Sequence, residues 1–156
     1  MIHDLASIDD DVILGENVKV WEYAGIRSGA VVGENSIIGR NVYEGPGVSI
    51  GKNCKIQNNA LIYEPAVIGD GVFIGPAVVL TNDKYPRATS AESRLKTAED
   101  WDPVGVVVND GASIGANAVC VAPVSLGKNS MVGAQSVVTK DVEAKATVVG
   151  NPARVI

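Results

Sequence analysis

The sequence predicts an all-β fold: a triangular solenoid of very short parallel strands with one long inserted loop. Three features indicate it, namely a six-residue apolar repeat, an unusual composition and a polar segment that interrupts the repeat. Of the 156 residues, 46% are apolar and 20% are charged, so the chain is long and hydrophobic enough to bury a core. With 17 glycines and only 4% aromatic residues, that core has to be built from Val, Ile and Ala between tight turns.

The apolar repeat recurs at every sixth position. Counted from Ile8 to Leu80, twelve of thirteen such positions are aliphatic, and the series resumes from Val108 to Val138 with Cys120 among its members. The residue four places after each member of the series is small in most cases. A period of six matches neither a helix nor plain alternation. It suits a short strand plus a corner, with strands of successive coils stacked in parallel about 4.7–4.9 Å apart.

A longer period of eighteen residues indicates three sides per coil. The triplets Gly15–Asn17, Gly33–Asn35, Gly51–Asn53 and Gly69–Gly71 recur at this spacing. Asn and Gly tolerate the left-handed backbone that a corner requires. Each buried aliphatic side chain contributes roughly 1.5–3 kcal/mol, so the stacked column supplies the stability of the fold. A β-sandwich with coincidental spacing is the alternative, and the regular register disfavours it.

Glu44 occupies the single position where the aliphatic series fails between Ile8 and Leu80. An unpaired charge inside such a narrow prism costs on the order of several kcal/mol. We therefore expect the corner at residues 43–47 to shift and turn Glu44 outward. A buried Glu44, either protonated or paired, is the alternative that the sequence leaves open.

The repeat is absent from residues 82–105, which are polar and charged, with Pro86 and Pro103 near the two ends. Residues 90–101 are compatible with one or two short helical turns. A long excursion from a compact domain is usually functional or disordered. Because the coil resumes afterwards, we interpret this segment as an active-site loop inserted into a single domain of residues 1–156.

Charge and composition exclude several functional classes. The net charge of -5 argues against a nucleic-acid partner. No stretch approaches the roughly 18 apolar residues of a membrane span, and the first residues do not resemble a signal peptide. Two cysteines, Cys54 and Cys120, form no disulfide framework, which fits a cytoplasmic protein. His3 is the only histidine, so a three-histidine zinc site is excluded and no metal is expected.

The hexads resemble those of the hexapeptide-repeat acyltransferases, which fold as left-handed parallel β-helices and act as trimers. The resemblance covers essentially the whole chain. The left hand is implied by the resemblance alone, since parallel crossovers in general are right-handed. The closing segment Val149–Arg154 is similar to the element that lies against coenzyme A in this superfamily. The superfamily also includes γ-type carbonic anhydrases, whose zinc histidines this chain lacks, and sugar-nucleotidyltransferase domains.

Two further motifs resemble one subgroup, which N-acetylates nucleotide-linked 3-amino sugars. They are Lys55–Glu64, which begins KIQNN, and Leu80–Arg87, which reads LTNDKYPR. Members act on UDP-2-acetamido-3-amino-2,3-dideoxyglucuronate or dTDP-3-amino-3,6-dideoxyhexoses. The resemblance implies an acetyl-CoA-dependent N-acetyltransferase that supplies cell-surface polysaccharide synthesis. It also implies a homotrimer with active sites between subunits.

Asn82 and Asp83 are the candidate catalytic residues. The resemblance implies that Asn82 positions the substrate amine, while Asp83 holds the charge of the amine or accepts its proton. Many superfamily members use a histidine base, and this chain has none beyond His3. A sugar amine loses its proton more easily than lysine, whose pKa is about 10.4, so orientation and oxyanion stabilisation are expected to suffice. A simple turn is the alternative interpretation of this pair.

Six residues are candidates for substrate binding: Gln57, Asn58, Asn59, Tyr63, Glu64 and Arg87. The side-chain amides of Gln57, Asn58 and Asn59 are expected either to form hydrogen bonds with sugar hydroxyls or with the edge of a uracil-type base, or to be a stack of solvent-exposed side chains. Arg87 suits a pyrophosphate or a sugar carboxylate. Trp21 and Trp101 are expected to cover a subunit contact or to stack on a base.

Five residues are candidates for binding acetyl-CoA: Ala122, Ala134, Lys140, Pro152 and Arg154. The resemblance implies that Ala122 and Ala134 flank the pantetheine and that Lys140 or Arg154 meets the phosphates. Cys120 occupies an inward position and is expected to be an inert core thiol. Two other functions stay open: acetylation of another small amine or hydroxyl acceptor, and a non-catalytic β-helical binding or scaffold protein.

Overall fold

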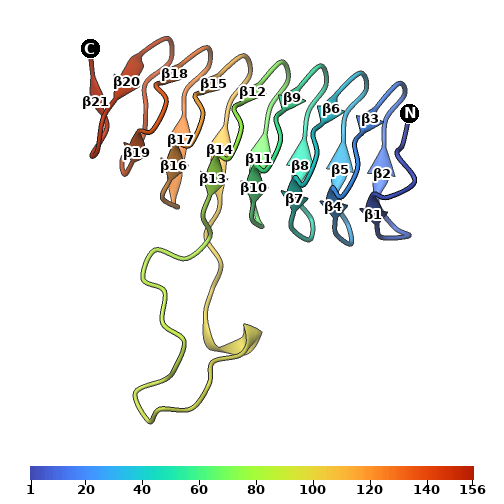
Figure 1. Cartoon of the computed structure of the whole chain (residues 1–156). Helices are drawn as coiled ribbons and strands as arrows, with labels where there is room; N and C mark the ends of the chain where they lie inside the picture. The colour runs from blue at the N-terminus through green and yellow to red at the C-terminus, as the bar shows by residue number, and fades with distance from the viewer.

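The computed structural model describes residues 1–156 as an elongated solenoid with the two termini at opposite ends (Figure 1). Each coil contributes one short strand to each of three sheets, and nearly every strand pairs in parallel with the strand eighteen residues away. This arrangement confirms the predicted triangular β-helix.

The three sheets run the length of the solenoid. The first sheet contains β1 (Ser7–Ile8), β4 (Gly25–Ile26), β7 (Tyr43–Glu44), β10 (Leu61–Ile62), β13 (Val79–Leu80), β16 (Val119–Cys120) and β19 (Val137–Val138). The second contains β2 (Ile13–Leu14), β5 (Val31–Val32), β8 (Ser49–Ile50), β11 (Val67–Ile68), β14 (Val106–Val108) and β17 (Val124–Leu126). The third contains β3 (Lys19–Val20), β6 (Ile37–Ile38), β9 (Lys55–Ile56), β12 (Phe73–Ile74), β15 (Ser113–Ile114), β18 (Met131–Val132), β20 (Thr147–Val149) and the antiparallel β21 (Arg154–Val155).

Both residue series that the sequence analysis placed inside form the core. A single cluster of 33 buried apolar residues fills the solenoid. Every sixth-position residue from Val20 onward is buried, including Glu44, the one member of the series that is not apolar. Ile8 and Leu14, at the open N-terminal end, are partly exposed. The small residues lie inside as well, because Ala24 and Ala60 have no exposed surface.

The corners between the second and third sheets have the predicted backbone. Asn17, Asn35 and Asn53 adopt φ angles of 59°, 59° and 56°, and Gly71 adopts 65°. Successive corners stack so closely that a Cβ atom on Gly33 would lie 2.5 Å from the carbonyl carbon of Gly51. Glycine is therefore required there by the close approach of the next coil.

The position of Glu44 corrects one expectation. Its side chain points inward and is fully buried, between Ile26 and Ile62 in the ladder of the first sheet. The corner does not shift, since the N–H of Gly45 keeps its regular hydrogen bond to the Ile62 carbonyl at 2.9 Å. Neither carboxyl oxygen has a hydrogen-bond partner, and burial raises the pKa of Glu44 to about 8. A neutral carboxyl group is far less costly to bury than a charge, which removes the reason for the corner to move.

The inserted loop leaves the solenoid where the first sheet turns into the second. β13 ends at Leu80 and β14 begins at Val106, and the intervening segment extends away from the coils (Figure 1). It contains one 3₁₀ turn, η1 (Ala98–Asp100), in the region where the sequence predicted a short helical turn. As η1 is the only helix, the structure has no helix with the length and apolar character of a membrane span.

Candidate functional site

The candidate residues lie on two of the three edges of the solenoid. The loop edge, where the first sheet turns into the second, carries Tyr63, Glu64, Asn82, Asp83, Ala122 and Lys140. The amide edge, where the third sheet turns into the first, carries Gln57, Asn58, Asn59 and Ala134, while Pro152 lies in the turn between β20 and β21. Arg87 lies in the loop and Arg154 in β21. The first sheet separates the two edges, so one chain does not bring these two groups together.

The base of the loop is held firmly against the solenoid. The backbone carbonyl of Asn82 accepts a hydrogen bond from the Val104 N–H at 3.0 Å, which ties the two ends of the loop to each other. The neighbouring Thr81 donates its N–H to the Cys120 carbonyl and accepts the Ala122 N–H at its hydroxyl, both at 3.0 Å. The backbone of Asn82 is thus fixed, while its side-chain amide forms no hydrogen bond within the chain and is free to bind a ligand.

Asp83 is already engaged in a turn. Its Oδ1 accepts the N–H of Tyr85 at 2.8 Å, which is the local hydrogen bond that aspartate commonly makes in turns. Four residues further on, the Arg87 guanidinium donates only to the Pro86 carbonyl, at 3.1 Å. Asp83 therefore has one carboxylate oxygen left for a ligand, and Arg87 keeps most of its donors.

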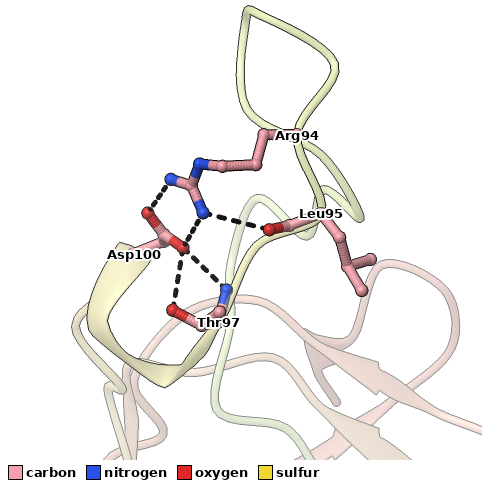
Figure 2. Close-up of polar contacts among 4 residues, drawn as sticks. All are labelled: Arg94, Leu95, Thr97 and Asp100. Atoms are coloured by element: carbon pink, nitrogen blue, oxygen red, sulfur yellow. Dashed lines mark hydrogen bonds and ion pairs between the residues drawn. The ribbon is translucent and has the colours of Figure 1, made fainter.

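The outer part of the loop has its own brace (Figure 2). Arg94 donates to both carboxylate oxygens of Asp100, at 3.0 and 2.5 Å, and to the Leu95 carbonyl at 3.0 Å. Asp100 Oδ2 also accepts the N–H and the hydroxyl of Thr97, at 2.7 and 3.0 Å. The hydrogen bonds from Arg94 and then from Thr97 hold the pKa of Asp100 well below its usual range. This brace gives a largely exposed segment a defined shape.

The braced loop forms the walls of a hollow of about 390 Å³ that is open to solvent. Its walls include Asp83, Arg87, Leu95, Lys96 and Trp101. Two cationic side chains beside an indole ring suit a ligand that combines an anionic group with a flat or apolar part. The structure thus brings Arg87 and Trp101 together, and it adds Lys96, for which the sequence offered no motif.

On the loop edge, Tyr63 and Glu64 lie one coil before Asn82. The Tyr63 N–H donates to the Leu80 carbonyl at 3.3 Å, and the Tyr63 ring packs on Tyr43 with centroids 5.3 Å apart and planes inclined by 51°. Sequence reasoning did not single out Tyr43 or its neighbour Arg27. The signal that could have found Arg27 is the eighteen-residue period itself, since positions 27, 45, 63 and 81 form one column along this edge.

On the amide edge, only one of the three consecutive amides is free. Asn59 adopts a φ of 62°, and its Oδ1 accepts the side-chain N–H of Asn41 at 3.2 Å. Asn58 Oδ1 accepts the Arg40 N–H at 2.9 Å. These two residues stabilise the corner, whereas the side-chain amide of Gln57 forms no hydrogen bond within the chain.

Gln57 borders a groove of about 350 Å³ on this edge. Trp21 lies on the opposite side, with Gly39 and Ile37 between them, and Arg40 contributes to the rim. Arg40 pairs with Glu22 at 3.6 Å. The groove therefore presents an indole ring and an unengaged amide two coils apart, with small or apolar residues as its floor.

The candidate cofactor residues separate into different places. Ala122 is fully buried, which corrects the expectation that it flanks a pantetheine. Ala134 lines an apolar hollow on the third sheet with Phe73 and Met131. Lys140 and Arg154 share a hollow near the C-terminal end of the solenoid, while Pro152 is exposed at the final turn. Cys120 is buried as expected, and burial raises the pKa of its thiol to about 12.

Comparison with protein families identifies the repeat. The family described as bacterial transferase hexapeptide (six repeats) matches residues 29–64 and 47–82, and the hexapeptide repeat of succinyl-transferase matches residues 105–140. Together the two models cover more than half of the chain. The chain belongs to the hexapeptide-repeat transferase family. The β-helix of this family is the fold described above, including its inward aliphatic ladder.

Relatives of this hexapeptide-repeat protein include several acetyltransferases. The chain is 55% identical over 49 residues to dTDP-3-amino-3,6-dideoxy-alpha-D-galactopyranose 3-N-acetyltransferase of Aneurinibacillus thermoaerophilus, a match that covers 31% of this chain and 26% of that protein. It is 49% identical over 51 residues to 2,3,4,5-tetrahydropyridine-2,6-dicarboxylate N-acetyltransferase of Staphylococcus aureus, covering 33% and 21%. The matches thus span about a quarter of the length of these curated relatives.

Solved structures share the fold along most of the chain. A hexapeptide-repeat acetyltransferase of Vibrio cholerae, complexed with acetyl coenzyme A, is 27% identical with a TM-score of 0.64, and the alignment covers 83% of this chain and 70% of that one. The N-acyltransferase AntD of Bacillus cereus, in complex with dTDP-4-amino-4,6-dideoxyglucose and coenzyme A, is 19% identical with a TM-score of 0.65, covering 99% and 78%. The second likeness shows the fold alone.

Proposed function

We propose that this protein is an acetyl-CoA-dependent N-acetyltransferase that acts on the amine of a nucleotide-linked 3-amino sugar. The observation that carries the proposal is the 55% identity over 49 residues to an enzyme named for 3-N-acetylation of a dTDP-linked amino sugar. The unengaged Asn82 amide on a fixed backbone supports it, because such a group holds an amine in one orientation. The acetyl coenzyme A bound by the Vibrio cholerae relative supports the choice of cosubstrate.

The proposed reaction is attack of the neutral sugar amine on the thioester carbonyl carbon. A C–N bond forms, the tetrahedral intermediate collapses with cleavage of the C–S bond, and coenzyme A leaves as a thiol after the nitrogen has lost one proton. Asn82 orients the amine, and the free oxygen of Asp83 stabilises its charge or accepts the proton. No histidine takes part in the proposed reaction, because His3, the only histidine, precedes β1 and pairs with Val20, whereas the loop follows β13 several coils later.

The substrate and the cosubstrate are assigned by chemistry. Arg87 and Lys96 in the loop hollow suit the pyrophosphate. Gln57 beside Trp21 suits a pyrimidine base, which would stack on the indole ring and form hydrogen bonds with the Gln57 side chain. The hollow next to Ala134 suits the pantetheine. Lys140 and Arg154 suit the phosphates of acetyl-CoA.

A homotrimer with active sites between subunits is part of the proposal. The loop edge and the amide edge lie on opposite sides of the first sheet, so a second copy is needed to place Gln57 and Asn82 around one substrate. A light-scattering mass of three chains is expected. Because acetyl-CoA is available in the cytoplasm, we place the reaction there.

The test is coenzyme A thiol release with acetyl-CoA and a panel of UDP- and dTDP-linked 3-amino sugars. Asn82→Ala is expected to lower kcat/KM at least tenfold while leaving the oligomer intact, and unchanged kinetics would remove Asn82 from the mechanism. Lys84→Ala, in the same loop but outside the hollow, serves as the matched control. The panel includes tetrahydropyridine dicarboxylate because of the Staphylococcus aureus relative. Turnover of that acceptor alone, or of simple free amines alone, would overturn the assignment of a nucleotide sugar.

A further inference from the structure

The N-terminal end of the solenoid leaves two of its three sheets without a neighbouring strand. β1 and β2 are the outermost strands of the first and second sheets on this side, and each pairs only with the strand one coil further along. The third sheet is covered, because Ile2 pairs in parallel with Val20 of β3. The end of the solenoid therefore has two open strand edges beside one that the chain itself has filled.

The filled edge shows what such an edge accepts. The Val20 N–H donates to the Met1 carbonyl, and the Val20 carbonyl accepts the His3 N–H, both at 2.9 Å. The corresponding groups of β1 and β2 are the N–H and the carbonyl of Ile8 and of Leu14, and these form no hydrogen bond within the chain. Unpaired strand edges accept a further strand, so an extended segment held as residues 1–3 are held fits both of them.

The C-terminal end of the solenoid has no such opening. β21 pairs with β20, and Val142 pairs with Leu126 of β17. Val137 of β19 donates its N–H to the Gly150 carbonyl at 2.9 Å and accepts the Ala153 N–H at 2.8 Å. All three sheets are thus covered at that end, as expected for a terminal repeat that faces water. The open edges are a property of the N-terminal end alone.

Apolar side chains lie between the open edges. Ile8 and Leu14 belong to the inward ladder but are partly exposed here, and Ile2 and Leu5 beside them are 44% and 54% exposed. A segment that covers both edges buries the ladder side chains only if it carries aliphatic residues six positions apart, the spacing of Ile8 and Leu14. The occupant that fits is therefore one hexad of extended chain.

Charge decides which kind of hexad this end attracts. Residues 1–18 contain five acidic residues and no Lys or Arg, so they carry the whole net charge of -5. Asp4, Asp10 and Glu16 are exposed, and one of them lies at each of the three corners of this coil. A second copy of this end would bring like charges together, whereas a segment rich in Lys and Arg is attracted.

We propose that the N-terminal end of the solenoid docks a basic extended segment of a partner protein, which adds one parallel strand to β1 and one to β2. Two aliphatic residues of that segment stack on Ile8 and Leu14, and a Lys or Arg at the corner between them faces Asp10. The docking is independent of the proposed acetyl transfer, because the inserted loop leaves the solenoid after β13, several coils away.

The first measurement is fluorescence anisotropy of a labelled peptide, KRTVTGKNTVKR, titrated with the full chain. Binding is expected to be saturable and to weaken as salt is raised, because the contributing charges are exposed. Two control peptides are expected to bind at least roughly tenfold more weakly. The first, EETVTGENTVEE, reverses the charge. The second keeps the basic sequence but has the amide that follows each valine N-methylated, so it cannot donate to the open edges.

A charge variant tests whether the acidic corners are responsible. Asp4→Asn combined with Asp10→Asn is expected to weaken binding of the basic peptide roughly three- to tenfold, since two exposed charge contacts are lost. Glu99→Gln combined with Asp102→Asn is the matched control. It removes the same charge from exposed positions of the inserted loop, and its affinity is expected to equal that of the wild type.

The second measurement is amide hydrogen exchange. The amides of Ile8 and Leu14 are expected to exchange at least roughly tenfold more slowly with saturating basic peptide, because they become hydrogen-bonded. Binding without this protection, or equal binding of the N-methylated peptide, overturns the added strands and leaves only charge attraction. A lack of saturable binding overturns the proposal altogether. If the free protein doubles its mass in light scattering as its concentration rises and protects these two amides without peptide, the occupant is a second copy, and the basic partner is refuted.

Discussion

Replacing Glu44 provides a direct test of how the core tolerates an acid. Its folded-state pKa of about 8 lies above the ordinary value of 4.5 because the side chain is fully buried without a partner. The folded protein therefore holds the proton more tightly than the unfolded chain does. This contribution to stability is fully present below pH 4.5, declines as the pH rises and levels off above pH 8. Between pH 5 and pH 8 the free energy of unfolding is expected to fall by roughly 3–4 kcal/mol on account of this residue alone.

Glu44→Gln isolates the ionisation. The amide keeps the shape and polarity of the protonated acid but does not titrate. The difference in stability between the wild type and this variant is therefore expected to change by roughly 3–4 kcal/mol from pH 5 to pH 8. Glu44→Ile restores the aliphatic ladder. It is expected to exceed the wild type by about 3 kcal/mol or more at pH 7, since it removes both the ionisation cost and an unsatisfied buried group.

The assay is urea unfolding at pH 5 and pH 8, followed by Trp fluorescence at one fixed protein concentration, because assembly would otherwise contribute to stability. Parallel pH dependence of the wild type and Glu44→Gln would refute the reasoning. It would mean that Glu44 is ionised in the folded protein, either turned out or hydrated inside the coil.

Two further predictions concern the corners and the loop. Gly33→Ala is expected to lower the free energy of unfolding by roughly 1–3 kcal/mol, because the added Cβ meets the backbone of the next corner at 2.5 Å. Urea unfolding measures this loss, with Gly25→Ala as the control variant. Equal unfolding midpoints of the two variants would contradict the close-packing argument. Asp100→Asn is expected to speed amide hydrogen exchange across residues 94–101 while leaving the thermal midpoint of the solenoid unchanged, since the brace is confined to the loop. Because the pKa of Asp100 is lowered, wild-type protection in this segment should persist at pH 4 and be lost only in stronger acid, and loss already at pH 5 would count against the brace.

The candidate site was only partly predictable. The sequence placed Asn82 at the base of the loop and Tyr63 with Glu64 at a neighbouring corner, because the eighteen-residue period assigns every residue a position on the coil. It did not distinguish Gln57, whose amide is free, from Asn58 and Asn59, whose amides hold the corner. Side-chain hydrogen bonds of this kind depend on the adjacent coil, so a single hexad carries no information about them.

The hexad pattern alone determined the solenoid, its inward ladder and the left-handed corner residues, because each coil repeats the same local requirements of burial and backbone conformation. Only the tertiary structure decided the fate of Glu44 and the setting of Glu64. The ladder of the first sheet holds Glu44 between Ile26 and Ile62 whatever its chemistry, since a register shift would break the hydrogen bonds of two neighbouring coils. Likewise, the room over Gly45 is visible only when the coils are stacked, because it is the side chain of the next coil that occupies it.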